Sequence, residues 1–293
     1  MKDADMTHLS LPIHMVEKPW GRTNLPAPFV APSGQRIGEI WFTPPPALDR
    51  LLIKYIFTSE RLSVQVHPSD TQTEAMGMGR QGKEECWLVL DAEPGSCLGI
   101  GFEREYDEAT LRAAALDGQI EHRLRWQPVK PGDFFYIPAN TVHAIGAGIS
   151  LIEIQQNSDT TYRLYDYGRP RQLHIDAALA VASRTPYDFA RYTQRGAADE
   201  RILADGPHFR LIRLAGPPSN RVARVLSDNP FYIMPVVGQV TGAGGYIEPG
   251  ACARVRRLED ISLASDCLAL VAQPVRTTKT SVSPARALKE AVS

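Results

Sequence analysis

The segment that most constrains the fold is residues 131–169, PGDFFYIPANTVHAIGAGISLIEIQQNSDTTYRLYDYGR. It opens on a Pro-Gly-Asp turn and continues as an aromatic strand over Asp133–Ile137, which Pro138 ends. A short polar loop leads to His143, and after two glycine breaks Ile149–Gln156 has the composition of a second strand. Two strands joined by a tight corner, with a histidine held at the corner, are typical of a β-barrel that carries a metal.

A polar run follows the second strand and ends at an arginine between two tyrosines. Gln155–Thr161 is polar, and Arg163 lies between Tyr162 and a further tyrosine two residues on. An arginine beside tyrosines at a barrel mouth can bind a phosphate or a carboxylate through its planar, multidentate guanidinium. The alternative is a structural ion pair, with Asp159 or Asp166 as the partner.

Composition indicates a globular protein rich in short strands. The chain has 293 residues, 43% of them hydrophobic and 22% charged, which suffices for a packed core and for one large or two ordinary domains. The 23 prolines and 22 glycines are spread along the chain and favour short strands and turns over long helices. The predicted fold class is therefore mostly β, with a few short helices.

Charge and cysteine usage narrow the class of function and the compartment. The net charge is −1 and no basic patch is present, which indicates neither a nucleic-acid partner nor a membrane partner. The four cysteines lack CxxC spacing and indicate free thiols in a reducing compartment. The first residues are too polar for a signal peptide and no apolar run approaches about 18 residues, so the expected location is cytoplasmic. The sequence does not predict an oligomeric state.

The order of the predicted elements suggests two β domains. Residues 1–184 form the first, with a helix inserted at 107–116; residues 185–200 are a linker, 201–280 a second β domain and 281–293 a tail. Residues 1–36 are Pro-rich and are expected to be irregular. The expected strands of the first domain are Gly38–Thr43, Leu51–Phe57, Leu62–His67, Glu85–Leu90, Asp133–Ile137 and Ile149–Gln156, and its expected helices are Ser69–Met76, Asp107–Leu116 and Ile175–Ser183. The expected apolar runs of the second are 209–214, 222–226, 231–237, 253–255 and 268–271.

Four side chains in the first domain form a candidate metal site. Gln65 and His67 lie two residues apart, so on a strand both face the same side. Glu85 begins another strand and His143 sits at the corner described above. Two imidazoles, a carboxylate and an amide oxygen are a plausible ligand set for a divalent ion, although each residue alone is weak evidence.

The second half of this pattern resembles the cupin motif G-x5-P-x-G-x2-H. Gly132, Pro138 and His143 have the required spacing, and Asn140 replaces the second glycine, as an asparagine that tolerates the left-handed conformation can do. More specifically, the sequence resembles the short bacterial form of the type I mannose-6-phosphate isomerases. The matching segments are VQVHPSD (64–70), GKEECWLVL (82–90), PGDFFYIPANTVHAIG (131–146) and LIEIQQNSDTTYRLYDYGR (151–169).

The resemblance implies two cupin or jelly-roll β domains and one zinc ion per chain, other divalent ions being possible. It implies that the zinc ligands are Gln65, His67, Glu85 and His143. The family's active-site arginine falls on Arg163, its aspartate on Asp159 and its lysine on Lys83. Longer members have His-Lys-Pro-Glu where this chain has Gly-Lys-Glu-Glu, so the group that opens the sugar ring is left undefined.

The implied activity is the interconversion of D-mannose 6-phosphate and D-fructose 6-phosphate, with the sugar phosphate as partner. Such a reaction needs a base that moves a proton between adjacent carbons, and a cation that stabilises the developing oxyanion. Lys83 is the favoured base, provided that its pKa is lowered, and Asp159 is the rival, with ring opening or orientation of Arg163 as its other roles. The alternatives are another metal-dependent sugar-phosphate isomerase, a cupin oxygenase, and a non-catalytic sugar-phosphate-binding cupin.

Overall fold

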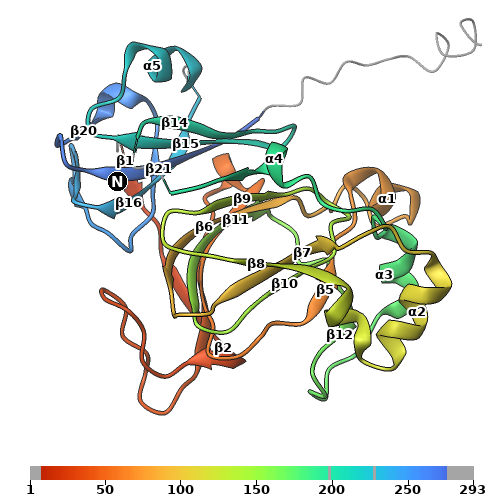
Figure 1. Ribbon diagram of the computed structural model, residues 1–293. Helices are drawn as coiled ribbons and strands as arrows, with labels where there is room; N and C mark the ends of the chain where they lie inside the picture. The colour runs from red at the N-terminus through yellow and green to blue at the C-terminus, as the bar shows by residue number, and fades with distance from the viewer. Residues whose placement is uncertain (1–7, 197–198, 227–228, 276–293) are drawn as a thin grey trace, which may run out of the picture.

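The computed structural model describes residues 8–196, 199–226 and 229–275. Two facing antiparallel sheets form the first half of the chain (Figure 1). The seven-stranded sheet has the order β13-β9-β6-β11-β4-β3-β2 and the five-stranded sheet the order β12-β5-β10-β7-β8. The seven strands are β2 (Ile13–Arg22), β3 (Ile37–Phe42), β4 (Leu51–Phe57), β6 (Glu85–Ala92), β9 (Phe134–Ile137), β11 (Ile149–Gln156) and β13 (Thr193–Gln194). The five are β5 (Val64–Val66), β7 (Cys97–Phe102), β8 (Leu124–Pro128), β10 (His143–Ile145) and β12 (Tyr162–Tyr165).

Two further sheets are built mainly from the second half. The six-stranded sheet has the order β1-β19-β16-β21-β15-β14, and a three-stranded sheet has the order β18-β17-β20. Their strands are β1 (His8–Ser10), β14 (Arg201–Asp205), β15 (Phe209–Ala215), β16 (Phe231–Val237), β17 (Val240–Gly242), β18 (Gly245–Ile247), β19 (Ala253–Val255), β20 (Ile261–Leu263) and β21 (Leu268–Pro274). Strand β1 pairs with β19, so the start of the described chain lies among the C-terminal strands (Figure 1).

Short helices complete the described part: α1 (Asp70–Ala75), α2 (Glu108–Leu116), α3 (Ile175–Val181), α4 (Phe189–Tyr192) and α5 (Asn220–Leu226), with 3-10 turns η1 (Pro46–Leu48), η2 (Gln119–Arg123) and η3 (Leu258–Asp260). Ser69 caps α1 in a capping box with Gln72, and Asp107 caps α2. None of the helices in the described residues is long and apolar enough to cross a membrane.

The seven-stranded sheet is buried on both faces, which explains its apolar strands. Along β6, Trp87 and Val89 belong to the core between the two facing sheets, whereas Cys86 and Leu88 belong to a core shared with the six-stranded sheet. Helices α2 and α3 pack on the five-stranded sheet through another apolar cluster. The layers therefore run from helices through the five-, seven- and six-stranded sheets to the three-stranded sheet.

The mostly β fold class, with antiparallel sheets and a few short helices, is confirmed, as are the strands and helices expected in the first half. Asn140 has a φ of 74°, the left-handed conformation predicted for it at the corner. The division into domains at residues 184 and 200 stays a prediction, and the expected tail at 281–293 lies outside the described residues.

Two expectations about local structure are wrong. Residues 13–22, expected to be irregular, form β2, which tolerates Pro19 because it is the edge strand of its sheet and is irregular in register there. Residues 222–226, grouped with the β runs, are helical, because Val222 and Leu226 are buried at i, i+4 spacing while the residues between them are more exposed. The described part of residues 185–200 contains α4 and β13, and the role of this segment as a linker stays a prediction.

A buried hydrogen bond ties the six-stranded sheet to the first half of the chain. The hydroxyl of Tyr232, a fully buried side chain on β16, donates to the carbonyl of Leu48 at 2.7 Å. We predict that Tyr232→Phe lowers the free energy of unfolding by about 1–2 kcal/mol, because the carbonyl loses a buried donor while the ring still fits. Urea unfolding measures the loss. Tyr246→Phe, at a residue 62% exposed, is the matched control and should change nothing; equal effects would contradict this account.

Candidate metal centre

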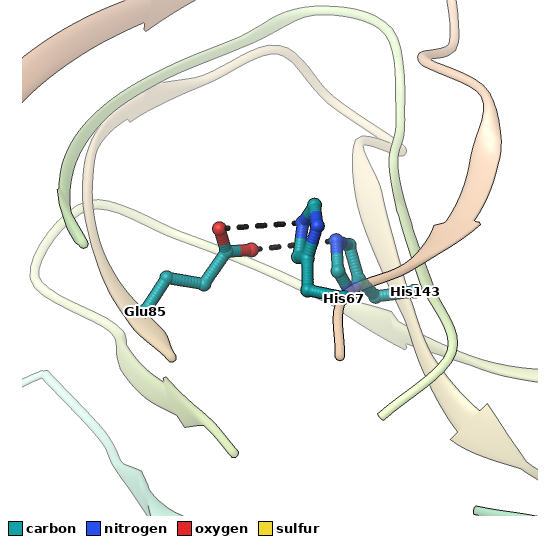
Figure 2. Close-up of side chains that lie close together, drawn as sticks. All are labelled: His67, Glu85 and His143. Carbon is teal, nitrogen blue, oxygen red and sulfur yellow. Dashed lines mark ion pairs between the residues drawn. The ribbon is translucent and has the colours of Figure 1, made fainter. Parts of the chain in front are cut away.

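Three ligand-bearing side chains converge between the two facing sheets. The ligand atoms of His67, Glu85 and His143 all lie within 4.8 Å of one another, and Figure 2 shows the Glu85 carboxylate facing both imidazoles. The three side chains are at most 2% exposed. Burial at this depth requires each polar atom to find a partner.

Strand register brings the predicted residues together. Strand β5 lies between β12 and β10, and Gln65 on β5 is directly opposite His143 on one side and Arg163 on the other. Directly opposed residues share a face of a sheet, so these three form one row. Glu85 enters from the facing seven-stranded sheet, at the first residue of β6.

Backbone carbonyls fix the tautomer of both histidines. The Nδ1–H of His67 donates to the Thr160 carbonyl and the Nδ1–H of His143 to the Thr141 carbonyl, both at 2.9 Å. Burial, reinforced by Lys83, lowers the pKa of His67 well below its ordinary value, and burial lowers the pKa of His143 to about 4. Both rings are therefore neutral near pH 7, with the Nε2 lone pair directed at the cluster.

The Glu85 carboxylate is incompletely satisfied. Its Oε1 is buried without a hydrogen-bond donor, 3.3 Å from the lone pair of His143 Nε2. Its Oε2 accepts from Lys83 Nζ and lies 3.6 Å from His67 Nε2. Burial raises the pKa of Glu85 to about 7 although Lys83 opposes that rise. In this buried site acceptor atoms face one another, and a cation placed between them would stabilise the arrangement.

Gln65 can supply a fourth ligand atom. Its side-chain amide nitrogen lies 3.3 Å from His143 Nε2, and its amide oxygen accepts from the Ser63 hydroxyl at 3.0 Å. Rotating the amide by 180° would direct the oxygen to the cluster and let the nitrogen donate to Ser63, which can also accept. Two imidazole nitrogens, a carboxylate and an amide oxygen are a donor set that fits a divalent ion such as zinc.

A cavity of about 180 Å³ opens beside the cluster. The remaining predicted site residues, Lys83, Asp159 and Arg163, all line it together with Gln65. Its other lining residues are Lys18, Trp20, Glu39, Trp41, Lys54, Ile56, Leu62, Ser63, Trp87, Ile145, Glu153, Ser158, Thr161 and Arg171. The structure thus brings every predicted site residue to one cluster and its adjoining cavity.

Arg163 is the unpaired arginine of this cavity. Among the described residues it makes no ion pair, and its Nε is buried without a hydrogen-bond acceptor. Asp166, a partner considered from the sequence, is instead held by Arg169 at 3.0 Å and by Arg171 at 2.5 Å. Burial, with the charge of Arg171, lowers the pKa of Arg163. An arginine with free donors facing a cavity is available for an anion.

Lys83 is buried beside the cluster, and the neighbouring carboxylates raise its pKa; the lowering expected beside a bound metal ion stays a prediction. Burial favours the neutral amine, yet the carboxylates of Glu153 and Glu85 outweigh burial and raise the pKa. The amine contacts Glu85 Oε2 and lies 3.2 Å from His67 Nε2. A base at this position therefore requires these carboxylates to be neutralised by another cation.

The seven-stranded sheet carries a row of charged and aromatic residues that was not predicted from the sequence. Glu153 on β11 is directly opposite both Trp87 and Lys54, and Lys54 is opposite Trp41. Trp87 Nε1 donates to Glu153 Oε1 at 3.1 Å, and Lys54 Nζ lies 3.3 Å from Glu153 Oε2 and 4.8 Å from the Trp41 ring centre. The available signal was a lone charge within each of two apolar strands, LLIKYIF and ISLIEIQQ.

The fold and the site define a cupin-type β protein with a candidate metal centre between the sheets of its first jelly roll. Over 137 residues the chain is 44% identical to the mannose-6-phosphate isomerase ManA of Bacillus subtilis and 45% identical to that of Streptococcus mutans, covering 45% of this chain and 43% of each relative. The matched region is thus less than half of those relatives. No family model matches.

Solved structures share the fold over nearly the whole chain. The mannose 6-phosphate isomerase from Bacillus subtilis superposes with a TM-score of 0.74 at 23% identity, covering 91% of this chain and 99% of that one. A mannose 6-phosphate isomerase described as holo and zinc-bound gives a TM-score of 0.65 at 14% identity, covering 92% and 100%. The resemblance to mannose-6-phosphate isomerases drawn from the sequence motifs is therefore confirmed.

The buried Lys54–Glu153 pair generates a prediction about pH. Although burial works against its charge, Lys83 and Lys54 lower the pKa of Glu153 to about 2. A carboxyl whose pKa is lowered on folding stabilises the fold above its unfolded value of about 4.5, and that contribution is lost as pH falls toward 2. Lys54→Met should cost about 3 kcal/mol of unfolding free energy at pH 7, and the deficit should shrink between pH 4.5 and 3.

Urea unfolding of parent and variant at pH 7, 4.5 and 3 measures this deficit. Arg61→Met is the control, because Arg61 is half exposed in its pair with Glu121 and should contribute under about 1 kcal/mol at any pH. A Lys54→Met deficit that stays constant from pH 7 to 3 would show that lost packing, and not the Glu153 charge, accounts for it.

Proposed function

We propose that the chain interconverts D-mannose 6-phosphate and D-fructose 6-phosphate. One divalent ion, with zinc as the favoured metal, is held by Gln65, His67, Glu85 and His143. The observation that carries the proposal is the row across β12, β5 and β10. In this row only Gln65 lies between the unpaired Arg163 and His143, which belongs to the buried cluster of acceptor atoms. The similarity to mannose-6-phosphate isomerases supports the choice of substrate. A cytoplasmic location stays a prediction from the sequence.

The donor set decides what the cluster can contribute. Two neutral imidazoles and one carboxylate satisfy zinc, and the carbonyl bonds to Nδ1 orient both rings. A bound ion would supply a Lewis acid that stabilises the negative charge developing on the sugar oxygens as a proton moves between C2 and C1. Holding an ion requires Lys83 Nζ to leave Glu85 and His67, and Lys83 also lines the cavity.

The cavity residues bind and orient the substrate. Arg163 offers free donors to the phosphate or to a sugar oxygen. Trp20, Trp41 and Trp87 supply apolar walls that exclude water from the reacting carbons. Lys83 and Asp159 are the candidates for moving the proton, and among the described residues no ion pair joins Asp159 to Arg163, which favours ring opening over orientation for Asp159.

The activity test uses purified, zinc-loaded protein. We predict turnover of mannose 6-phosphate to fructose 6-phosphate, its loss on chelator treatment and its return with zinc. Arg163→Ala should lower kcat/KM by about a hundredfold or more while zinc content and unfolding stay at parent values, because a substrate contact is lost and no ion pair is broken. Arg184→Ala, at an exposed arginine outside the cavity, is the control.

The alternatives give different outcomes in the same assay. Preferential turnover of glucose 6-phosphate would indicate another sugar-phosphate isomerase. Binding of sugar phosphates without any turnover by the zinc-loaded protein would indicate a non-catalytic binding protein. Consumption of oxygen would indicate an oxygenase, since the cluster also contains the two histidines and one carboxylate that non-haem iron oxygenases use.

The identity of the base is tested by following the C2 proton. Lys83 lies two residues before Glu85 and is buried in the cavity wall, so it is the better placed candidate; Asp159 is exposed at the cavity edge. Lys83→Ala should reduce solvent exchange of the C2 proton at least a hundredfold, whereas Asp159→Asn should retain that exchange on ring-opened substrate. Parent-rate exchange in Lys83→Ala would transfer the role to Asp159.

A further inference from the structure

Residues 82–84, which include Lys83 and lead into Glu85, are held in place by three hydrogen bonds from their backbone amides. The Gly82 amide donates to Asp70 Oδ1 at 2.9 Å, and the Lys83 amide donates to the Pro68 carbonyl at 3.0 Å. The Glu84 amide donates to Gln156 Oε1 at 2.9 Å. Residues 82–84 therefore have their backbone fixed by three separate acceptors, none of which belongs to the metal cluster.

Two carboxylates stand at the outer side of this segment. Asp70 accepts from Gly82 and, at 3.1 Å, from the Gln156 amide nitrogen, and Arg80 reaches it at 3.4 Å. The side chain of Arg80 is 62% exposed, so that pair is screened by solvent. The Asp70 and Glu84 side chains are only 13% and 12% exposed. Neighbouring carboxylates at this degree of burial need a shared cation or donor.

His208, from the C-terminal half, lies beside both carboxylates. Its Nε2 lies 3.1 Å from Glu84 Oε2, and its Nδ1 lies 3.9 Å from Asp70 Oδ2. The residue sits in the turn between β14 and β15, and its carbonyl accepts from the Val275 amide at 2.9 Å. The next residue, Phe209, is fully buried in the shared core and packs 5.7 Å from the Tyr136 ring. The imidazole is thus carried by a rigid part of the fold.

We propose that His208 is a positioning residue, through which the C-terminal half clamps Glu84 and thereby fixes the segment that carries Lys83 and Glu85. It touches neither the cluster nor the cavity, so it acts through the Glu84 side chain and the backbone of residues 82–85. A displacement of a few tenths of an ångström in this segment moves a ligand and the candidate base together. The effect on catalysis rests on the proposed function, whereas the clamp itself does not.

Amide hydrogen exchange tests the clamp without reference to activity. In His208→Ala the Gly82, Lys83 and Glu84 amides should exchange roughly three- to tenfold faster than in the parent, a coupling typical of directly contacting side chains. Amides of β15 and β21 should keep parent rates, because their ladder is intact. His208→Gln, whose amide can donate to Glu84, should restore most of the protection. His122→Ala, at an exposed histidine elsewhere, should change nothing.

Chelator competition and kinetics give the second readout. His208→Ala and Glu84→Gln should each release zinc roughly three- to tenfold faster and lower kcat more than they change KM, and the double variant should be no worse than either alone. Additive effects, or unchanged exchange at residues 82–84, would overturn the clamp. Accelerated exchange throughout β15 and β21 would overturn it as well, by showing general loosening. A parent protein that turns over no sugar phosphate, with the local exchange pattern as expected, would refute the proposed function alone.

Discussion

The site depends on the register of three short strands. β5 has only three residues, yet because it pairs with β10 and β12 on its two sides, Gln65 is flanked by His143 and by Arg163. A slip of one residue in either pairing would turn the whole set to the opposite face of the sheet. The apolar residues alternating with Gln65 resist that slip, since Val64 and Val66 are fully buried against α2 and α3. The packing of Val64 and Val66 against the helices thus determines that Gln65 and Arg163 face the cavity.

Burial of the seven-stranded sheet on both faces sets the electrostatics of the cavity. Charged side chains on its inner face are largely removed from bulk water, so a partner within the cavity stabilises each of them. Lys54 with Glu153, and Lys18 with Glu39 at 3.5 Å, satisfy this requirement. Arg163 and the free oxygen of Glu85 do not. The lysines of the cavity and Arg171 are paired with carboxylates, so these two unsatisfied groups mark where a bound anion and a bound cation would be stabilised.

Residue pattern predicted the local features well because they depend on near neighbours. The period of two along residues 62–67, the cap at Ser69 and the left-handed Asn140 follow from the chain's own sequence. The long-range features did not follow. Nothing in the residues around Lys54 or Lys83 shows that Glu153 will lie beside them, so the Lys54–Glu153 pair was missed, as was the contribution of Glu153 to raising the pKa of Lys83. The β2 strand was missed because Pro19 argues against a central strand, and only the topology of the sheet shows that β2 is an edge strand.

The C-terminal half contributes to the site without entering it. It offers no ligand to the cluster among the described residues, but its six-stranded sheet covers the outer face of the sheet that carries Glu85 and Glu153. Removing that cover would expose Cys86, Leu88 and Ile154 to water while their alternating neighbours remained in the site. A strand cannot be solvated on one face and keep a dry, preorganised site on the other without losing packing that fixes its position. The six-stranded sheet is therefore needed to keep the cluster and its cavity in place. His208, beside Glu84, is the side chain of the C-terminal half through which we propose that this support acts.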